Sequence, residues 1–401
     1  MTRSWVLSIA AACGLGALVS SPAPTPAQDK DKKKNADIEQ AIERGLDYLK
    51  KTQAQDGRWD SAGNQYSTPF TALAGMALLM EGSNLHAGKY SDQVSKAVGW
   101  FLKPANQTAA GKLGIDNPAE AQRYMYGHGF ATMFLASVYG EEEDGEQRKK
   151  LEAALKKAVD FIAKAQTSKK HRANGKELDI GGWGYVSAAD GSNFDEGSVT
   201  ITQIQALRAA RNAGIPVPKE TIDKAVNYLD ACTTNDGGII YNYTGGGGGQ
   251  PGRPALTAAA LACGLSTGEF TKAGGVMRGA NPPKGNDRPS VVKWFENCKK
   301  TIVVAKGRQN HEEYQMYYYS QAMYAIGDDK WGEMFPADAK ENWLTWSKFK
   351  DVVYPYLVEA QDKNNGSWNG SGSWVQAPVF ATAVNLTILQ LDKGILPIYQ
   401  K

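Results

Sequence analysis

Two hydrophobic patterns alternate along this chain. The first is amphipathic: Ile38, Ile42, Leu46 and Leu49 recur at three- and four-residue steps and form one apolar stripe of a helix. The second is apolar nearly all round and rich in Ala, Leu, Met and Thr, which is typical of a helix buried on all sides. Segments of the second kind lie at residues 68–80, 129–139, 198–213, 255–265, 314–326 and 379–391. The patterns predict helical hairpins, each with an amphipathic outer helix and a buried inner helix.

An aromatic residue marks each outer helix. These residues are Tyr48, Trp100, Phe161, Tyr228, Trp294 and Tyr356. They recur about every 60 residues, which indicates an internal repeat. Six such hairpins cannot bury their inner helices separately, whereas closing them into a ring covers every inner face and leaves no solenoid end exposed. We therefore predict an all-α fold, an (α/α)6 toroid, over residues 38–401.

A Gln…Gly-x-Trp pattern follows the outer helix in several units. It reads Gln53, Gly57 and Trp59 in the first unit and recurs in the sixth at residues 361, 366 and 368. The third unit stretches the pattern, and the fourth lacks both Gln and Trp. The pattern predicts a helix C-terminus capped by the Gln amide, a Gly with positive φ and an indole stacked across the junction.

The N-terminus predicts export. Arg3 precedes an apolar run at residues 5–19 that is shorter than the roughly 20 residues of a membrane span, and small residues near Ala27 form a cleavage site. We predict a signal peptide at residues 1–28, a charged linker at 29–37, and a periplasmic or secreted protein with no transmembrane segment after signal removal. Cys232, Cys263 and Cys298 would then remain, an odd number that predicts buried free thiols.

Charge and composition narrow the function. Forty-five basic residues against 42 acidic ones leave a net charge of +3, which argues against a nucleic-acid partner held by bulk charge. Aromatic residues make up 10% of the chain, enough to line a large cavity. No His-x-x-x-His or paired-Cys spacing is present, so neither a metal nor a cofactor is predicted.

The junction pattern is close to the QW repeat of triterpene cyclases. Together with the segments at residues 124–129, 198–214 and 317–323, it makes residues 37–401 resemble the squalene cyclase and protein prenyltransferase superfamily, in particular its bacterial exported prenyltransferase/squalene-oxidase-repeat proteins. The resemblance implies that the inner helices begin at one end of a central cavity. Residues expected to bind a ligand there are Tyr66, Phe70, Tyr126, Ser198, Arg253, Tyr314, Gln315, Tyr317 and Trp374.

The residues that carry the family's chemistry are altered. Ser198 takes the place of the acid that protonates the substrate in the cyclases, and a hydroxyl cannot protonate an alkene. The Asp-x-Cys and His zinc ligands of the prenyltransferases have no counterpart at the matching inner helices. The remaining candidates for catalysis are Asp195, Glu196 and His128, although the two acids also suit a helix N-terminus and His128 also suits a structural role.

Three functions stay open. The altered motif favours a toroid with little or no catalytic activity, which binds an isoprenoid lipid or an envelope protein in an aromatic cavity. A divergent terpene or squalene cyclase could use Asp195 or Glu196 as its acid. A cell-envelope polysaccharide-active enzyme, since (α/α)6 rings also host such enzymes, would need paired carboxylates across the cavity.

Overall fold

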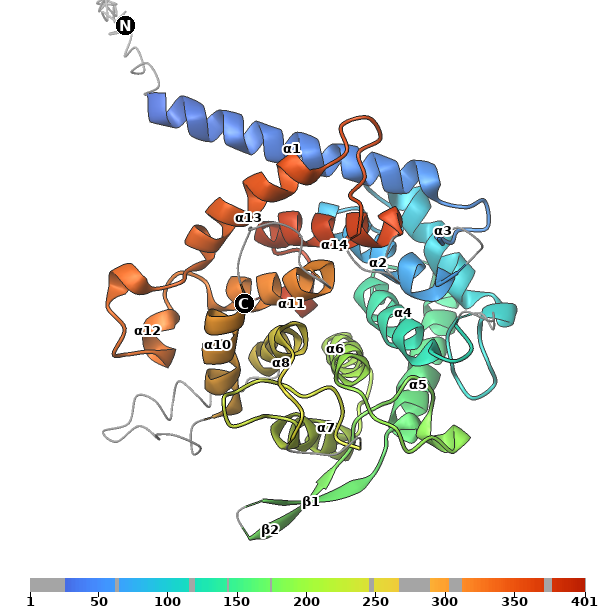
Figure 1. The fold of residues 1–401 in the computed structure, drawn as a ribbon. Coiled ribbons are helices and arrows are strands. Elements are labelled where there is room, and N and C mark those ends of the chain that lie inside the picture. Colours follow the sequence, from blue (N-terminus) through green and yellow to red (C-terminus); the bar gives the residue numbers. More distant parts are fainter. Residues whose placement is uncertain are drawn as a thin grey trace, which may run out of the picture.

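The fold is a closed ring of six helical hairpins (Figure 1). The structure, a computed structural model, describes residues 26–61, 65–114, 120–142, 144–173, 175–244, 249–266, 289–302, 312–370 and 377–400. The outer helices are α1 (Pro26–Thr52), α3 (Ser91–Leu102), α5 (Gly145–Ala165), α7 (Lys219–Ala231), α10 (Ser290–Thr301) and α13 (Trp346–Ala360). The inner helices are α2 (Ser67–Glu81), α4 (Tyr124–Val138), α6 (Gly197–Asn212), α8 (Pro254–Ser266), α11 (Glu312–Ile326) and α14 (Pro378–Gln390).

The inner helices form the core. Each packs on the next in chain order, and α14 packs back on α2, so that the ring closes without a free end. Most residues of each inner helix are buried, as expected for segments that are apolar all round. The predicted (α/α)6 toroid is therefore confirmed. Cys232, Cys263 and Cys298 are buried free thiols, as predicted.

Short helical turns and one β-hairpin lie between the helices of the ring. A helical turn, α12 (Trp331–Met334), precedes α13, and 3-10 turns lie at η1 (Pro104–Asn106), η2 (Ala188–Asp190), η5 (Lys340–Asn342), η6 (Leu391–Lys393) and η7 (Pro397–Tyr399). An antiparallel hairpin, β1 (Lys169–Ala173) and β2 (Lys176–Ile180), fills the stretched third junction, with Lys169 opposite Ile180. The all-α prediction did not include this hairpin, which projects from the ring beside α7.

The segment predicted as a linker is helical. Helix α1 begins at Pro26 and runs without a break through residues 29–37. No Gly or Pro interrupts the sequence between Pro26 and Gly45, so nothing stops the helix from extending. The predicted signal peptide lies almost wholly outside the described residues. None of the described helices combines the length and the apolar character that crossing a membrane requires.

The Gln…Gly-x-Trp junctions tie neighbouring hairpins together. The Gln53 side-chain amide donates to the carbonyl of Gly57 and to that of Gln93 in α3, both at 2.9 Å. The Trp59 indole N–H donates to the Leu49 carbonyl at 2.8 Å, which satisfies an unpaired carbonyl in the last turn of α1. The indole therefore contributes a buried hydrogen bond to the junction, which the sequence pattern did not predict.

The same contacts close the ring. Gln361 donates to the carbonyls of Gly366 and Ala41, at 2.9 and 2.8 Å, and so joins the sixth hairpin to α1 of the first. The Trp368 indole donates to the Leu357 carbonyl at 2.7 Å. Gly366 has φ +83°, and a Cβ there would lie 2.4 Å from the carbonyl oxygen of Arg44. Positive φ and close approach to α1 both require glycine here.

Gly366→Ala tests this closure. We expect the free energy of unfolding to fall by about 1 kcal/mol from the left-handed backbone and by about 1–3 kcal/mol more from the clash with α1, as measured by chemical denaturation. Gly214→Ala is the matched control, because Gly214 has φ +80° but nothing within 4 Å of an added Cβ. Equal losses in the two variants would show that the contact with α1 does not matter.

Candidate functional site

A cavity of about 580 Å³ opens where the six inner helices begin. Every inner helix contributes to its wall: Phe70 from α2, Tyr126 from α4, Ser198 from α6, Leu256 from α8, Gln315 from α11 and Phe380 from α14. The predicted ligand-binding residues Tyr66, Arg253 and Tyr314 line it too. Since the helix N-termini point partial positive charge toward this space, the cavity favours anionic groups.

Glu196 is a buried carboxylate in the cavity wall. It caps the N-terminus of α6: its Oε2 accepts from the Val199 backbone N–H at 2.9 Å and from the Ser198 hydroxyl at 2.5 Å. The Tyr126 hydroxyl lies 3.2 Å from the same oxygen and is hydrogen-bonded to Ser198. These contacts hold the carboxyl at the start of α6, where it forms part of the cavity wall.

Burial governs the charge state of Glu196. Desolvation raises the pKa of this carboxyl above its ordinary value and outweighs the hydrogen bonds from Ser198 and Val199, which stabilise the ionised form. A carboxyl of this kind keeps its proton to a higher pH than an exposed glutamate. A shift in this direction suits a general acid, which must hold its proton until the substrate is bound.

A second carboxylate, Glu120, lines the same cavity. It lies in the turn before α4 and is almost fully buried, with 3% of its surface exposed. Its Oε1 accepts from the backbone N–H of Thr68 in the first turn of α2, at 3.2 Å. The cavity therefore holds two carboxylates from different hairpins, in environments that differ.

Aromatic rings and two arginines form one wall and the mouth. The Tyr185 and Tyr241 hydroxyls are hydrogen-bonded to each other. The Arg123 guanidinium lies 4.9 Å from the Tyr185 ring centroid, and that of Arg253 lies 4.1 Å from the Tyr241 centroid. Both arginines are exposed at the mouth.

Tyr66 adopts a strained backbone conformation at this cavity. It precedes α2 with φ 57° and ψ 33°, a left-handed conformation that costs a residue with a side chain about 1–2 kcal/mol. Its ring packs on Phe70, with centroids 6.0 Å apart, and Phe70 packs on Phe380 at 6.2 Å. Backbone strain is concentrated at functional sites, where surrounding structure holds it in place.

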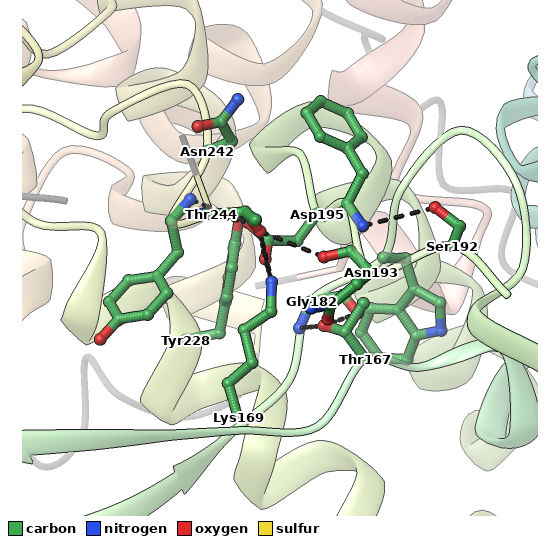
Figure 2. A network of polar contacts seen from close by, with 12 residues as sticks. Thr167, Lys169, Gly182, Ser192, Asn193, Asp195, Tyr228, Asn242 and Thr244 are labelled. Carbon is green, nitrogen blue, oxygen red and sulfur yellow. Dashed lines mark hydrogen bonds and ion pairs between the residues drawn. The ribbon is translucent and has the colours of Figure 1, made fainter. Parts of the chain in front are cut away.

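Asp195, next to Glu196 in sequence, has a different environment. Its side chain is fully buried and does not line the cavity. Oδ1 accepts from the Tyr228 hydroxyl at 3.0 Å and from the Tyr243 backbone N–H at 2.8 Å, while Oδ2 pairs with Lys169 of β1 and accepts from the Thr244 hydroxyl (Figure 2). These contacts join α7, the hairpin and the loop that carries Tyr241, which gives Asp195 a structural role instead of the predicted catalytic one.

His128 lies in the core between α4 and α5. It is fully buried, its Nδ1 accepts from the Leu113 backbone N–H at 3.0 Å, and its Nε2 donates to the Ala158 carbonyl at 3.2 Å. Burial lowers its pKa to about 4, so the ring is neutral at physiological pH. Both nitrogens are occupied and the ring is not in the cavity wall, so this geometry does not suit the catalytic role considered for it.

One described residue among those predicted to bind a ligand, Tyr317, is not in the cavity wall. Tyr317 is buried with its hydroxyl 2.7 Å from that of Tyr399. Trp374 lies outside the described residues. Glu312 and Glu313 line a separate small pocket between α11 and α13. Within the described part of the chain, no three His, Cys, Asp or Glu side chains are grouped as a metal site would need.

The ring matches solved structures of glycoside hydrolase family 76. An α-1,6-mannanase from Salegentibacter sp. HEL1_6 superposes with a TM-score of 0.57 at 9% identity, covering 88% of this chain and 98% of that one. An α-mannanase of the same family from Bacteroides thetaiotaomicron gives 0.55 at 10% identity, covering 89% and 96%. These structures share the ring with this chain and little of its sequence. No protein-family model and no curated protein sequence matches the chain.

A third match is an inactive variant of the Salegentibacter enzyme in complex with α-1,6-mannotriose. It has a TM-score of 0.55 and 9% identity, covers 88% of this chain and 98% of that one, and carries asparagine in place of two consecutive aspartates. In this chain the consecutive acids Asp195 and Glu196 precede an inner helix. Only Glu196 of this pair lines the cavity.

These matches correct three predictions. The resemblance to the squalene cyclase and prenyltransferase superfamily is wrong, because the matching rings are family 76 mannanases. The expectation of a non-catalytic or cyclase-like protein is wrong for the same reason, since those proteins are hydrolases. The expected isoprenoid lipid or envelope-protein ligand is also wrong, since the bound neighbours hold mannooligosaccharides. A repeat pattern identifies a ring, and rings with unrelated chemistries share it.

Sequence reasoning missed Glu120, Arg123, Tyr185 and Tyr241. The predicted second inner helix began at residue 129, whereas α4 begins at Tyr124, so Glu120 and Arg123 were not recognised as the residues before an inner helix. Their position before the helix start, like that of Glu196 before α6, is the signal that could have found them. Tyr185 and Tyr241 lie in loops whose path only the fold defines.

Asp195→Asn tests the structural role of this carboxylate. The amide cannot neutralise Lys169 and turns a donor toward the N–H and O–H groups that now donate to Asp195. We expect a loss of about 3 kcal/mol in the free energy of unfolding, measured by denaturation. Asp179→Asn is the control, because its pair with Lys170, at 2.8 Å on the same hairpin, is exposed and should contribute no measurable stability. Unchanged stability in Asp195→Asn would contradict the assignment.

His128 predicts a pH-dependent stability. Its folded pKa of about 4 lies below the value of roughly 6.5 in an unfolded chain. Between these two pH values the unfolded chain binds a proton that the folded protein does not, so stability falls as pH decreases, by about 3 kcal/mol in total. His128→Gln removes this pH-dependent contribution to the free energy of unfolding. The stability difference between wild type and variant should therefore shrink from pH 7 to pH 4, and a constant difference would exclude this role.

Proposed function

We propose that this protein is an exported glycan-active hydrolase, which cleaves glycosidic bonds in the cavity between Glu120 and Glu196. The observation that carries the proposal is this pair: two buried carboxylates, from different hairpins, line one aromatic cavity, and burial raises the pKa of one of them. Glycoside hydrolysis needs two carboxyl groups in unlike environments on either side of the scissile bond. The similarity of the ring to those of the mannanases also supports a glycan-active hydrolase.

Glu196 has the properties of the proton donor. Burial raises its pKa, which favours the protonated form, and its Oε2 is held by Val199, Ser198 and Tyr126, so the carboxyl orientation is set before a substrate arrives. From the cavity wall, the carboxyl would protonate the oxygen of the leaving sugar. Once Glu196 has given up its proton, the same three donors stabilise the carboxylate.

Glu120 serves as the second carboxylate. Its Oε1 accepts a hydrogen bond from the Thr68 backbone N–H at the N-terminus of α2. A negative charge on this side of the cavity stabilises the positive charge that develops on the sugar ring as the glycosidic bond breaks. The rings of Tyr66, Phe70 and Phe380 supply flat apolar surfaces against which sugar rings pack.

The N-terminal pattern supports a location outside the cytoplasm. The short apolar run after Arg3 and the small residues near Ala27 have the character of an export signal. The substrate would then be a polysaccharide of the cell envelope or of the surroundings.

Glu196→Gln tests the activity. The purified protein is incubated with a panel of neutral and acidic polysaccharides, α-1,6-mannan included, and new reducing ends are measured. We expect release by wild type and a loss of at least about 100-fold in Glu196→Gln, because an amide cannot act as the acid. Activity should also fall as pH rises through the raised pKa of Glu196.

Glu313→Gln is the matched control. This carboxylate is also buried at the start of an inner helix, but it lines the separate pocket beside α13. It should retain wild-type activity. Cleavage that survives in Glu196→Gln, or no cleavage of any glycan by wild type, would refute the proposal.

A further inference from the structure

The mouth of the cavity carries positive charge that has no role in the hydrolysis proposed for Glu120 and Glu196. Arg123 precedes α4 and Arg253 precedes α8, and both line the cavity. In the described part of the chain, no carboxylate lies within ion-pair distance of either guanidinium. Each arginine instead lies over a tyrosine ring, so its charge is available to a bound molecule.

The two arginines are held by one aromatic unit. Arg123 stacks on Tyr185, Arg253 stacks on Tyr241, and the hydroxyls of the two tyrosines are hydrogen-bonded. The Phe194 ring packs against both tyrosine rings, with its centroid 5.5 Å from that of Tyr185 and 6.5 Å from that of Tyr241. A guanidinium stacked on a ring keeps its N–H edge free and loses little further freedom when it binds an anion.

The unit lies beside the proposed acid. Tyr126, which contacts Glu196, packs on Tyr185 with centroids 5.9 Å apart. A sugar bound in the cavity beside the Tyr185–Tyr241 pair would therefore have its substituents near the arginines and its neighbour close to Glu196. The planar N–H fork of arginine matches the two oxygens of a carboxylate.

We infer that the substrate is an acidic glycan, whose uronic acid carboxylate is bound by Arg123 and Arg253 beside the Tyr185–Tyr241 pair. This inference rests on the proposed hydrolase function and specifies its substrate class. The raised pKa of Glu196 agrees with it, since burial favours the neutral acid and a neutral acid does not repel the bound carboxylate. The N-termini of α4 and α8 add favourable partial charge at the same mouth.

Matched glycans test the inference. Oligomers of galacturonate, mannuronate and glucuronate are each compared with their carboxyl-reduced form, which has the same linkage and ring but a neutral hydroxymethyl group. Binding is measured by calorimetry on Glu196→Gln to prevent turnover. We expect at least one acidic oligomer to bind roughly tenfold to a hundredfold more tightly than its reduced form, with a preference that weakens as salt rises.

Substitution of the arginines should remove the preference. Arg253→Gln and Arg123→Gln, made separately in the Glu196→Gln background, should each bring acidic and reduced oligomers to within about threefold of each other, whereas Arg253→Lys should keep part of the preference because it keeps the charge but not the fork. Arg148→Gln is the control: Arg148 also stacks on a tyrosine, 5.6 Å from the Tyr139 centroid, but lies on α5 outside the cavity wall. It should retain the full preference.

The outcomes separate this inference from the proposed function. Equal binding of every acidic oligomer and its reduced form would overturn the inference, and cleavage of neutral polysaccharide by the wild type would then leave the hydrolase intact. A preference unchanged in both arginine variants would also overturn it. Absence of cleavage and of binding for all glycans would refute the hydrolase itself.

Discussion

The ring depends on one repeated junction. Each complete Gln…Gly-x-Trp unit uses the Gln amide to bridge its own glycine to the next outer helix, and the indole N–H to satisfy the last turn of the preceding one. The Trp backbone N–H also donates to a threonine of the inner helix, as at Thr71 and Thr382. The junction thereby fixes three helices at once. Because the sixth junction bonds to α1, the repeat closes into a ring.

Closure places all six inner-helix starts at one end. The segments that enter these helices therefore converge, and their short polar caps become the wall of a cavity. Asp195 and Glu196, neighbours in the segment that leads into α6, have different environments. The backbone is extended at Glu196, so neighbouring side chains point to opposite sides. Asp195 is buried among Lys169, Tyr228 and Thr244, while Glu196 caps α6 and lines the cavity. Asp195 thus holds the loop in place, and Glu196 is the residue proposed as the catalytic acid.

The hydrogen bonds of Asp195 also help to position the two arginines at the mouth of the cavity. Asp195 accepts from the backbone N–H groups of Tyr243 and Thr244, which lie two and three residues beyond Tyr241, and the Tyr241 ring supports Arg253. The hydroxyl bond between Tyr241 and Tyr185 extends this support to Arg123. A network outside the cavity thus orients groups at its mouth. Within that network the Asp195 side chain is fully buried, while that of Lys169 is 15% exposed.

The sequence by itself determined the ring, its six hairpins and the end at which a site forms, because burial of an all-apolar helix is a local and repeated requirement. It also placed Glu196, Tyr126, Ser198 and Arg253 at that end. Only the tertiary structure decided which acid faces the cavity, that His128 is enclosed in the core, and that Glu120 joins Glu196 from another hairpin. These outcomes depend on side-chain direction and on contacts between distant segments, and neither is encoded in the spacing of residues along one helix.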